Sequence, residues 1–406
     1  MSCNEWKEVS VFEIGHVITG KTPSSKIPNQ FGKLLPFVTP TDFNNYHKWV
    51  YEAERYLSDD GVSRLQGKVL PTNSVLVTCI GSDMGKVAIS GVKCVTNQQL
   101  NSIIPFPKKV DSNFLYYTFG SMRGYLQQLA RGGTTMPIIN KGTFEKIKLI
   151  LPSLVEQKAI AHTLSCLDDK IELNNRINKT LEEMAQAIFK SWFVDFEPFQ
   201  DGEFEDSELG PIPKGWKVRT IGEIAEVIDC LHSKKPERCQ EGYPYLQLNN
   251  IRNDGLLDLS DIYLISNSDY QKWISRVEVS QGDCVITNVG RIGAVAQIPP
   301  VFKAAIGRNM TSIRCKTIFP YPTFLIECLL SKQMKNEINL RTDSGTILNA
   351  LNVKSIPKLR FVHPSDETLQ KFEDTVRPIR GAMEQNLEEN RCLTYIRDTL
   401  LSKLMS

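Results

Sequence analysis

The sequence predicts an α+β protein with two similar mixed α/β modules joined by two long antiparallel helices in a coiled-coil spacer. Three observations predict this fold class. A set of short motifs returns after about 210 residues, each copy holds short β-branched segments between turn residues, and each copy is followed by a long heptad pattern. The arrangement implies an internal pseudo-two-fold repeat.

The repeat begins near the N-terminus of the chain. Trp6-Lys7 returns as Trp216-Lys217, and Glu13-Ile14 returns as Glu223-Ile224. Later motifs keep a nearly constant offset: Phe114-Leu115 with Phe324-Leu325, Gly133-Thr134 with Gly345-Thr346, and Pro152-Ser153 with Pro364-Ser365. A period this long indicates a duplicated domain, because solenoid repeats are roughly 20–50 residues long. Two similar modules suggest a ligand with two similar halves.

Within each module the patterns favour short strands. Residues 75–78 and 285–287 are β-branched runs bounded by turn residues, and residues 86–89 and 294–296 follow as predicted hairpin partners. Phe114 and Phe324 are predicted to lie where helices open.

Each module is followed by a predicted long helix, with Ser153 and Ser365 as its N-cap. Apolar residues and paired asparagines then alternate at spacings of three and four. The two heptad seams are Leu164, Leu167, Ile171, Asn174, Asn178, Leu181, Ala185, Ile188, Trp192 and Val376, Ile379, Met383, Asn386, Asn390, Leu393, Arg397, Leu400, Leu404. The helices are expected to pack on each other or on helices of another protein; alternatively, each covers only its own module. About 38 helical residues span roughly 57 Å.

These patterns predict the following boundaries: first module 1–152, first long helix 153–199, acidic linker 200–215, second module 216–363, second long helix 364–406. Aromatic residues crowd the end of the first helix. They are expected to cap the helices or seat the second module, or alternatively to anchor a partner protein: Phe189, Trp192, Phe193, Phe196, Phe199.

Charge is segregated along the chain, although the net charge is only +2. Residues 1–153 carry 17 Lys/Arg and 11 Asp/Glu, and residues 211–364 carry 20 and 14. Both modules are therefore basic by +6, while the segments that follow them are acidic. A basic block is expected where a protein contacts phosphates, although a charge of this size also occurs on ordinary soluble surfaces.

Composition narrows the class of protein. The chain has no apolar run of about 18 residues and no signal-like start, so neither a membrane span nor secretion is expected. Its ten cysteines include no Cys-x-x-Cys pair and no Cys/His cluster with metal-ligand spacing. We expect reduced thiols, no metal site and a cytoplasmic location.

The sequence motifs of common catalytic sites are absent. No phosphate-binding loop, dinucleotide fingerprint, zinc-protease helix or nucleophile elbow occurs, and the five histidines are dispersed. Residues 81–86 resemble a phosphate loop with the wrong spacing and are better interpreted as a hairpin turn. No catalytic residue is predicted.

Polar loops at equivalent places in the two modules are the candidate DNA contacts. Asn and Gln suit adenine edges, Arg and Lys suit guanine edges, and Ser and Thr suit phosphates. The candidates are Lys21, Thr22, Ser24, Ser25, Lys26, Lys86, Gln98, Gln99, Arg131, Thr134 in the first module and His232, Ser233, Lys234, Lys235, Arg291, Arg308, Asn309, Ser344, Thr346 in the second. Ordinary turns and caps use the same residue types. The loops differ between the modules while the framework matches, as in two readers of different sequences.

With these motifs on hand, the chain resembles a type I restriction–modification specificity subunit over essentially its whole length. The resemblance rests on the repeated Trp-Lys start, residues 210–216 (Gly-Pro-Ile-Pro-Lys-Gly-Trp), the tract from Pro152 to Phe193, and the closing residues 397–404. It implies two target-recognition domains, each reading one half of an asymmetric bipartite site in double-stranded DNA.

The resemblance also implies partners. Two methylation subunits would carry S-adenosylmethionine, and motor-nuclease subunits would use ATP and magnesium, so the chain itself is expected to hold no cofactor. The expected subunit-interface residues are Leu164, Ile171, Leu181, Ile188, Trp192, Phe193, Ile379, Met383, Leu393, Leu400. The alternatives are a stand-alone DNA-binding regulator, a coiled-coil scaffold, and an enzyme with an unrecognised site.

Overall fold

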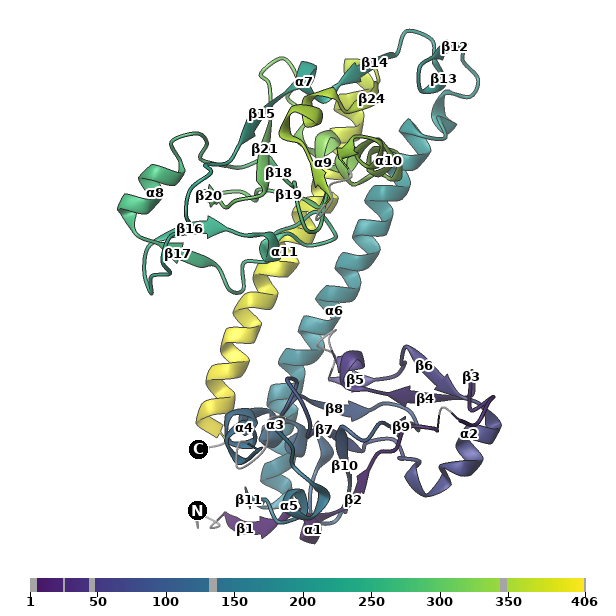
Figure 1. Ribbon diagram of the computed structural model, residues 1–406, viewed down its shortest axis with the longest axis vertical. Coiled ribbons are helices and arrows are strands. Elements are labelled where there is room, and N and C mark those ends of the chain that lie inside the picture. Colours follow the sequence, from purple (N-terminus) through teal and green to yellow (C-terminus); the bar gives the residue numbers. More distant parts are fainter. Residues whose placement is uncertain (1–5, 25, 44–47, 131–136, 344–348, 405–406) are drawn as a thin grey trace. The chain divides into compact units, whose positions relative to one another are not determined.

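The computed structural model describes residues 6–24, 26–43, 48–130, 137–343 and 349–404 (Figure 1). The chain forms two compact units. Unit 1 comprises residues 1–173 with 392–406, and unit 2 comprises residues 174–391. The boundary between the units therefore falls inside both long helices, α6 (Leu154–Phe193) and α11 (Asp366–Leu404).

Within the described residues, unit 1 contains three sheets. A five-stranded sheet has the order β2 (Gly15–Thr19), β10 (Leu100–Pro105), β7 (Val75–Thr78), β8 (Val87–Ser90), β5 (Trp49–Val50). A four-stranded sheet has the order β3 (Phe31–Gly32), β6 (Arg55–Leu57), β4 (Leu35–Val38), β9 (Val95–Thr96), and β1 (Lys7–Ser10) pairs with β11 (Lys148–Leu151). The short helices are α1 (Val11–Ile14), α2 (Asp59–Arg64), α3 (Ser112–Ser121), α4 (Arg123–Ala130), α5 (Lys141–Glu145), with 3₁₀ turns at Pro40–Phe43 and Gln66–Lys68.

Unit 2 repeats this plan. Its main sheet has the order β15 (Ala225–Asp229), β21 (Met310–Cys315), β18 (Cys284–Thr287), β19 (Val295–Gln297), and a second has the order β17 (Tyr263–Ile265), β16 (Tyr243–Leu246), β20 (Ala305–Ile306). The paired strands are β14 (Lys217–Thr220) with β24 (Arg360–His363), β22 (Thr342–Asp343) with β23 (Ala350–Leu351), and β12 (Phe204–Ser207) with β13 (Gly210–Pro213). The helices are α7 (Ile221–Ile224), α8 (Asn267–Trp273), α9 (Pro322–Leu330), α10 (Lys332–Leu340), with 3₁₀ turns at Glu197–Phe199, Leu248–Asn250 and Val353–Lys358.

The internal repeat extends to strand register. Thr19 of β2 pairs with Asn101 of β10, and Asp229 of β15 pairs with Thr311 of β21, in the same antiparallel sense. The predicted strands at 75–78 and 285–287 are confirmed as β7 and β18, and their predicted hairpin partners as β8 and β19. The turn at 81–86 joins β7 to β8, as the sequence predicts.

The repeated Glu-Ile motif has a structural cause. Glu13 completes a capping box with Ser10 at the start of α1, and its carboxylate accepts the Ser10 backbone N–H at 2.6 Å. Glu223 does the same for Thr220 at 2.7 Å in α7. Each box satisfies backbone donors that a helix start leaves without partners.

Both long helices begin where the sequence predicts. The Ser153 hydroxyl oxygen accepts the Glu156 backbone N–H at 3.3 Å, and Ser365 accepts that of Thr368 at 3.3 Å. Helix α11 continues through Pro378. No helix in the described part of the chain combines the length and the apolar character needed to cross a lipid bilayer.

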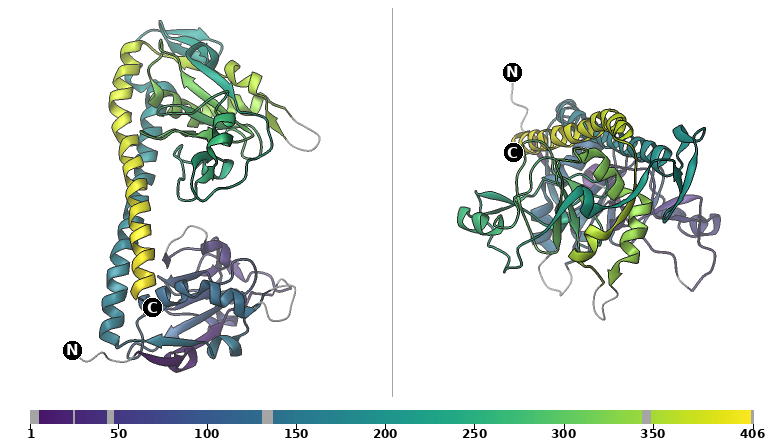
Figure 2. Two further views of the ribbon diagram at one scale, coloured as in Figure 1. Left: turned by 90° about the vertical axis from the view of Figure 1, so that its left-hand side faces the viewer. Right: turned by 90° about the horizontal axis from the view of Figure 1, so that it is seen from above.

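The two long helices pack against each other within each unit. Figure 2 shows α6 in teal and α11 in yellow. In unit 2, Asn174 donates to Asn390 at 2.9 Å and Asn386 donates to Asn178 at 2.8 Å, so the helices are antiparallel there. In unit 1, Arg397 pairs with Asp168 at 2.8 Å. The predicted antiparallel seam is therefore confirmed, and the polar positions fall inside it.

A buried polar cluster ties each module to the helices. In unit 2, Arg380 of α11 pairs with Glu327 of α9 at 2.9 Å, with side-chain exposures of 4% and 1%. In unit 1, the Tyr117 hydroxyl of α3 donates to Asp168 of α6 at 2.5 Å, and burial is the main cause that raises the tyrosine pKa. By the repeat, Tyr117 is equivalent to Glu327 and Asp168 to Arg380. At these equivalent positions, the second module has an ion pair, whereas the first module has a hydrogen bond between a tyrosine and an aspartate.

The aromatic residues at the end of α6 belong to the core of unit 2. Phe193 lies 5.0 Å from Phe324, 4.9 Å from Phe372 and 6.0 Å from Trp216, measured between ring centroids. These residues therefore seat the second module, as the first interpretation predicts. The segment predicted as a linker, residues 200–215, contains the β12–β13 hairpin.

Candidate nucleic-acid interface

In the first module, the loop after β2 lies against the turn that precedes β10. The Lys21 backbone N–H donates to the Thr96 carbonyl oxygen at 2.9 Å, and the Thr22 hydroxyl donates to the Gln98 side chain at 2.5 Å. A Cβ atom on Gly20 would lie 2.1 Å from the Asn97 carbonyl oxygen. Glycine is therefore required for this approach, and the two predicted loops form one surface.

Five of the seven first-module candidates that the structure describes are exposed on this surface: Lys21, Thr22, Ser24, Lys26, Gln98. Gln99 is half-buried and accepts a hydrogen bond from Asn97 at 2.7 Å. Lys86 is half-buried and pairs with Asp83 at 2.7 Å. The remaining candidates lie outside the residues that the structure describes: Ser25, Arg131, Thr134.

In the second module, the loop after β15 meets the turn before β21 at the equivalent place. Gly307 donates its backbone N–H to the Leu246 carbonyl oxygen at 2.9 Å, and Asn309 has a left-handed backbone with φ of 66°. The backbone N–H groups of Asn309 and Met310 face the sulfur of Cys230. This contact joins the two loops, as the Thr22–Gln98 bond does in the first module.

The second-module candidates differ in how firmly they are held. Lys235 donates to Gln247 at 2.6 Å, and its ammonium lies 4.2 Å from the centroid of the Tyr263 ring. Arg291 donates to the Ile251 carbonyl oxygen at 2.6 Å and to Asn253. The candidates His232, Lys234, Lys235, Arg291, Arg308 and Asn309 are exposed, Ser233 is half-buried, and Ser344 and Thr346 lie outside the described residues.

Four of these candidate cations form neither an ion pair nor a hydrogen bond through the side chain with another residue in the described ranges: Lys21, Lys26, Lys234, Arg308. Two come from each module. Exposed cations without a carboxylate partner retain their full charge for phosphate oxygens.

The residues expected at a subunit interface lie mainly inside the chain's own helix packing. Leu164 and Met383 are 0% exposed, and Phe193 is 2% exposed. The others are half-buried: Ile171, Leu181, Ile188, Trp192, Ile379, Leu393, Leu400. Their contact with a partner stays a prediction. Sequence reasoning did not single out the exposed apolar residues of α6: Val155 at 81%, Leu173 at 51%, Met184 at 47% and Ile177 at 39%.

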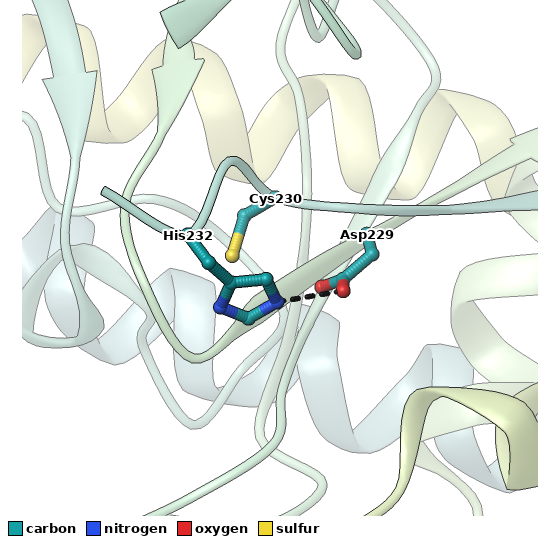
Figure 3. A group of neighbouring side chains, drawn as sticks. All are labelled: Asp229, Cys230 and His232. Carbon is teal, nitrogen blue, oxygen red and sulfur yellow. Dashed lines mark hydrogen bonds and ion pairs between the residues drawn. The ribbon is translucent and has the colours of Figure 1, made fainter.

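One cluster of potential ligand atoms follows β15. Asp229, Cys230 and His232 each offer one atom, and these atoms lie within 4.8 Å of one another (Figure 3). The His232 Nε2 atom lies 2.8 Å from the Asp229 Oδ2 atom. A search of the sequence for Cys-x-x-Cys pairs does not detect this cluster. A search for Asp-Cys-x-His would detect it, because residues 229–232 have that pattern.

Two equivalent modules, each with a pair of neighbouring polar loops, are carried by two long packed helices, which is the architecture of a two-part recognition protein. The family model of the type I restriction modification DNA specificity domain matches residues 4–183 and 213–372. The chain belongs to this family of type I restriction–modification specificity subunits.

Individual relatives are similar over their whole lengths. The MjaIX specificity subunit of Methanocaldococcus jannaschii is 30% identical over 409 residues, which cover 99% of this chain and 93% of that protein. The HindI specificity subunit of Haemophilus influenzae is 22% identical, with 99% of both chains covered. A crystal structure of a type I S subunit from M. genitalium has a TM-score of 0.60 at 19% identity, covering 100% and 98% of the two chains, and shows the same fold.

Proposed function

We propose that each module reads one half of a bipartite, asymmetric site in double-stranded DNA. The target-recognition domains are residues 1–152 and 216–363, and the segments 153–199 and 364–406, which contain α6 and α11, set the unread spacer. The observation that carries this proposal is the repeated loop pair. The same backbone frame presents Thr22 and Gln98 in one module and His232 and Arg308 in the other.

The chemistry of the loops suits different half-sites. Gln98 can pair with an adenine edge in the major groove, whereas Arg308 can pair with guanine through two hydrogen bonds. Lys21, Lys26 and Lys234 would contact phosphates and fix the register of each module on the duplex. Two readers built on one frame would therefore recognise different bases.

Catalysis in this proposal resides in partner subunits. Two methylation subunits carrying S-adenosylmethionine would dock on the long helices and methylate adenine after flipping it from the stack. Motor-nuclease subunits would add ATP- and magnesium-dependent cleavage. The exposed apolar side chains of Ile177 and Met184 on α6 support a docking surface on that helix.

The test is single-molecule mapping of N6-methyladenine in genomic DNA, with and without this gene, in cells that keep the methylation subunit. Loss of one bipartite asymmetric motif on deletion would support the proposal and identify both half-sites. An unchanged pattern of methylation, with the partner shown to be active, would contradict it. Specific binding by the purified chain alone would then favour a stand-alone regulator.

A further inference from the structure

The Asp229–Cys230–His232 cluster combines three side chains of the types that serve as transition-metal ligands in proteins. Asp229 is the last residue of β15, and the other two lie in the loop directly after it. Figure 3 shows the sulfur, the imidazole and the carboxylate gathered in one space. Bonds of about 2.0–2.3 Å place tetrahedral zinc ligands about 3.5 Å apart, which the 4.8 Å limit of this cluster allows.

Burial is the main influence on the Cys230 thiol and raises its pKa, so loss of the thiol proton would depend on the bound metal. The backbone N–H groups of Met310 and Asn309 face the Cys230 sulfur, and such donors stabilise a coordinated thiolate from outside the metal's own ligands. Cys230 is 1% exposed, whereas His232 is exposed, so the cluster opens to solvent on its imidazole side. Three protein ligands with one open side leave room for a water molecule as fourth ligand.

We propose that this cluster binds one zinc ion and thereby fixes the loop of residues 230–235. Without metal, the His232 Nε2 and Asp229 Oδ2 atoms lie 2.8 Å apart, within hydrogen-bond distance. Zinc would take both atoms and the sulfur as ligands. The Cys230 thiol proton would be released to solvent, and the neutral imidazole of His232 would carry its single N–H on Nδ1, which leaves Nε2 free to bind the metal. The oxidation states of metal and sulfur do not change.

One neighbouring cation competes with the metal. The Arg276 guanidinium lies 3.6 Å from the Asp229 Oδ2 atom and donates to the Cys230 carbonyl oxygen at 3.3 Å. Its side chain is 50% exposed and can leave the carboxylate without being buried elsewhere. Zinc affinity should therefore increase in Arg276→Ala, which is opposite in sign to the effect of a ligand substitution.

The consequence for recognition rests on the proposed function. Lys234 and Lys235 lie in the same loop, so zinc would hold two candidate phosphate contacts in place. Zinc binding is measured on the full chain without DNA. A failure of the metal proposal is therefore distinguishable from a failure of DNA recognition, which the methylation map reports.

The test uses the full-length chain, stripped with a chelator and then loaded with zinc or with cobalt(II) as a spectroscopic substitute. We expect about one equivalent of zinc after gel filtration, and a sulfur-to-cobalt charge-transfer band that reports a bound thiolate. Both should be lost in Cys230→Ser. Because Cys230 is buried, His232→Ala provides the second variant; its side chain is 62% exposed, and circular dichroism checks its fold.

The matched control is the His162–Cys166 pair on α6, whose sulfur lies 3.8 Å from the nearer ring nitrogen and which offers only two ligands. Cys166→Ser should retain the zinc and the cobalt band. The proposal is overturned if the wild type keeps no metal, if His232→Ala keeps as much as the wild type, or if Cys166→Ser removes the band.

Discussion

The side-chain amide of Asn386 on α11 donates to the side-chain Oδ1 atom of Asn178 on α6 at 2.8 Å. Asn178 is 3% exposed and donates in turn to the Met383 backbone carbonyl oxygen at 3.0 Å. A polar pair inside an apolar seam penalises every register that leaves it unpaired. The two asparagines therefore fix how the helices slide against each other.

Replacing Asn178 tests this role. Asn178→Ala leaves Asn386 without its partner, and we expect a loss of about 1–3 kcal/mol in the free energy of unfolding of unit 2. Chemical denaturation of the full chain measures it, with exposed Lys179→Ala as the control. The double variant with Asn386→Ala should cost less than the sum of the two single changes. Simple additivity would argue against a coupled pair.

The buried pair Arg380–Glu327 gives a second prediction. Arg380→Met leaves the Glu327 carboxylate buried without its cation, which should destabilise unit 2 by about 3–5 kcal/mol. Adding Glu327→Leu should recover much of that loss, because neither charge then remains. Arg377→Met is the control, since Arg377 is exposed and lies 3.6 Å from Asp374. An Arg380→Met chain as stable as the wild type would contradict this account.

Replacing Arg308 and mapping the methylated sites tests which half-site the second module reads. If its guanidinium pairs with guanine, Arg308→Ala should cost about 1–3 kcal/mol in discrimination at one position. The methylation map should then show relaxed specificity in one half-site only, with the other unchanged. Exposed Lys303, which pairs with Glu278 at 3.4 Å, is the control as Lys303→Ala. Relaxation in both half-sites would be inconsistent with two independent readers.

A matched deletion tests the spacer. Removing residues 169–175 from α6 and 390–396 from α11 keeps the Asp168–Arg397 and Asn178–Asn386 contacts and the heptad phase. Seven helical residues are about 10 Å, or about three base pairs. The methylated motif should lose about three unread bases with both half-sites intact. Deleting 169–175 alone should instead abolish methylation, because the seam then loses its register.

The pH dependence of stability should report the α7 capping box. The Thr220 backbone N–H is the main cause that lowers the Glu223 pKa from its usual 4.5. The carboxylate therefore stabilises the fold above about pH 4.5, and that contribution is lost as the pH falls through the lower, folded-state pKa. Glu223→Ala should melt below the wild type at neutral pH, and the difference should shrink in acid. Glu226→Ala, an exposed residue of β15, is the control.

The features that could be predicted from the sequence were those that repeat with a regular period. The seam positions of Asn174, Asn178, Asn386 and Asn390 follow from a spacing of three and four, and the duplication gives their equivalence. The Glu13-Ile14 motif marked the repeat, although its role as a capping box needed the structure. Local patterns of this kind carry enough signal in a single chain.

Contacts between distant loops were beyond such patterns. Thr22 and Gln98 are 76 residues apart, and only strand pairing brings them together. The acidic segment 200–215 has the composition of a linker, yet it forms a hairpin in which Phe204 lies 5.9 Å from the ring of Phe196. A tertiary contact of this kind overrides local propensity.

The division of the helices between the units orders events during synthesis. Unit 2 is a continuous stretch of chain, 174–391, whereas unit 1 needs the last turns of α11, where Leu400, Leu401 and Leu404 pack on its core. The first module to leave the ribosome is therefore the last to complete its core. Until then its apolar surface is a site where chaperones can bind, or where a neighbouring nascent chain can donate the missing helix.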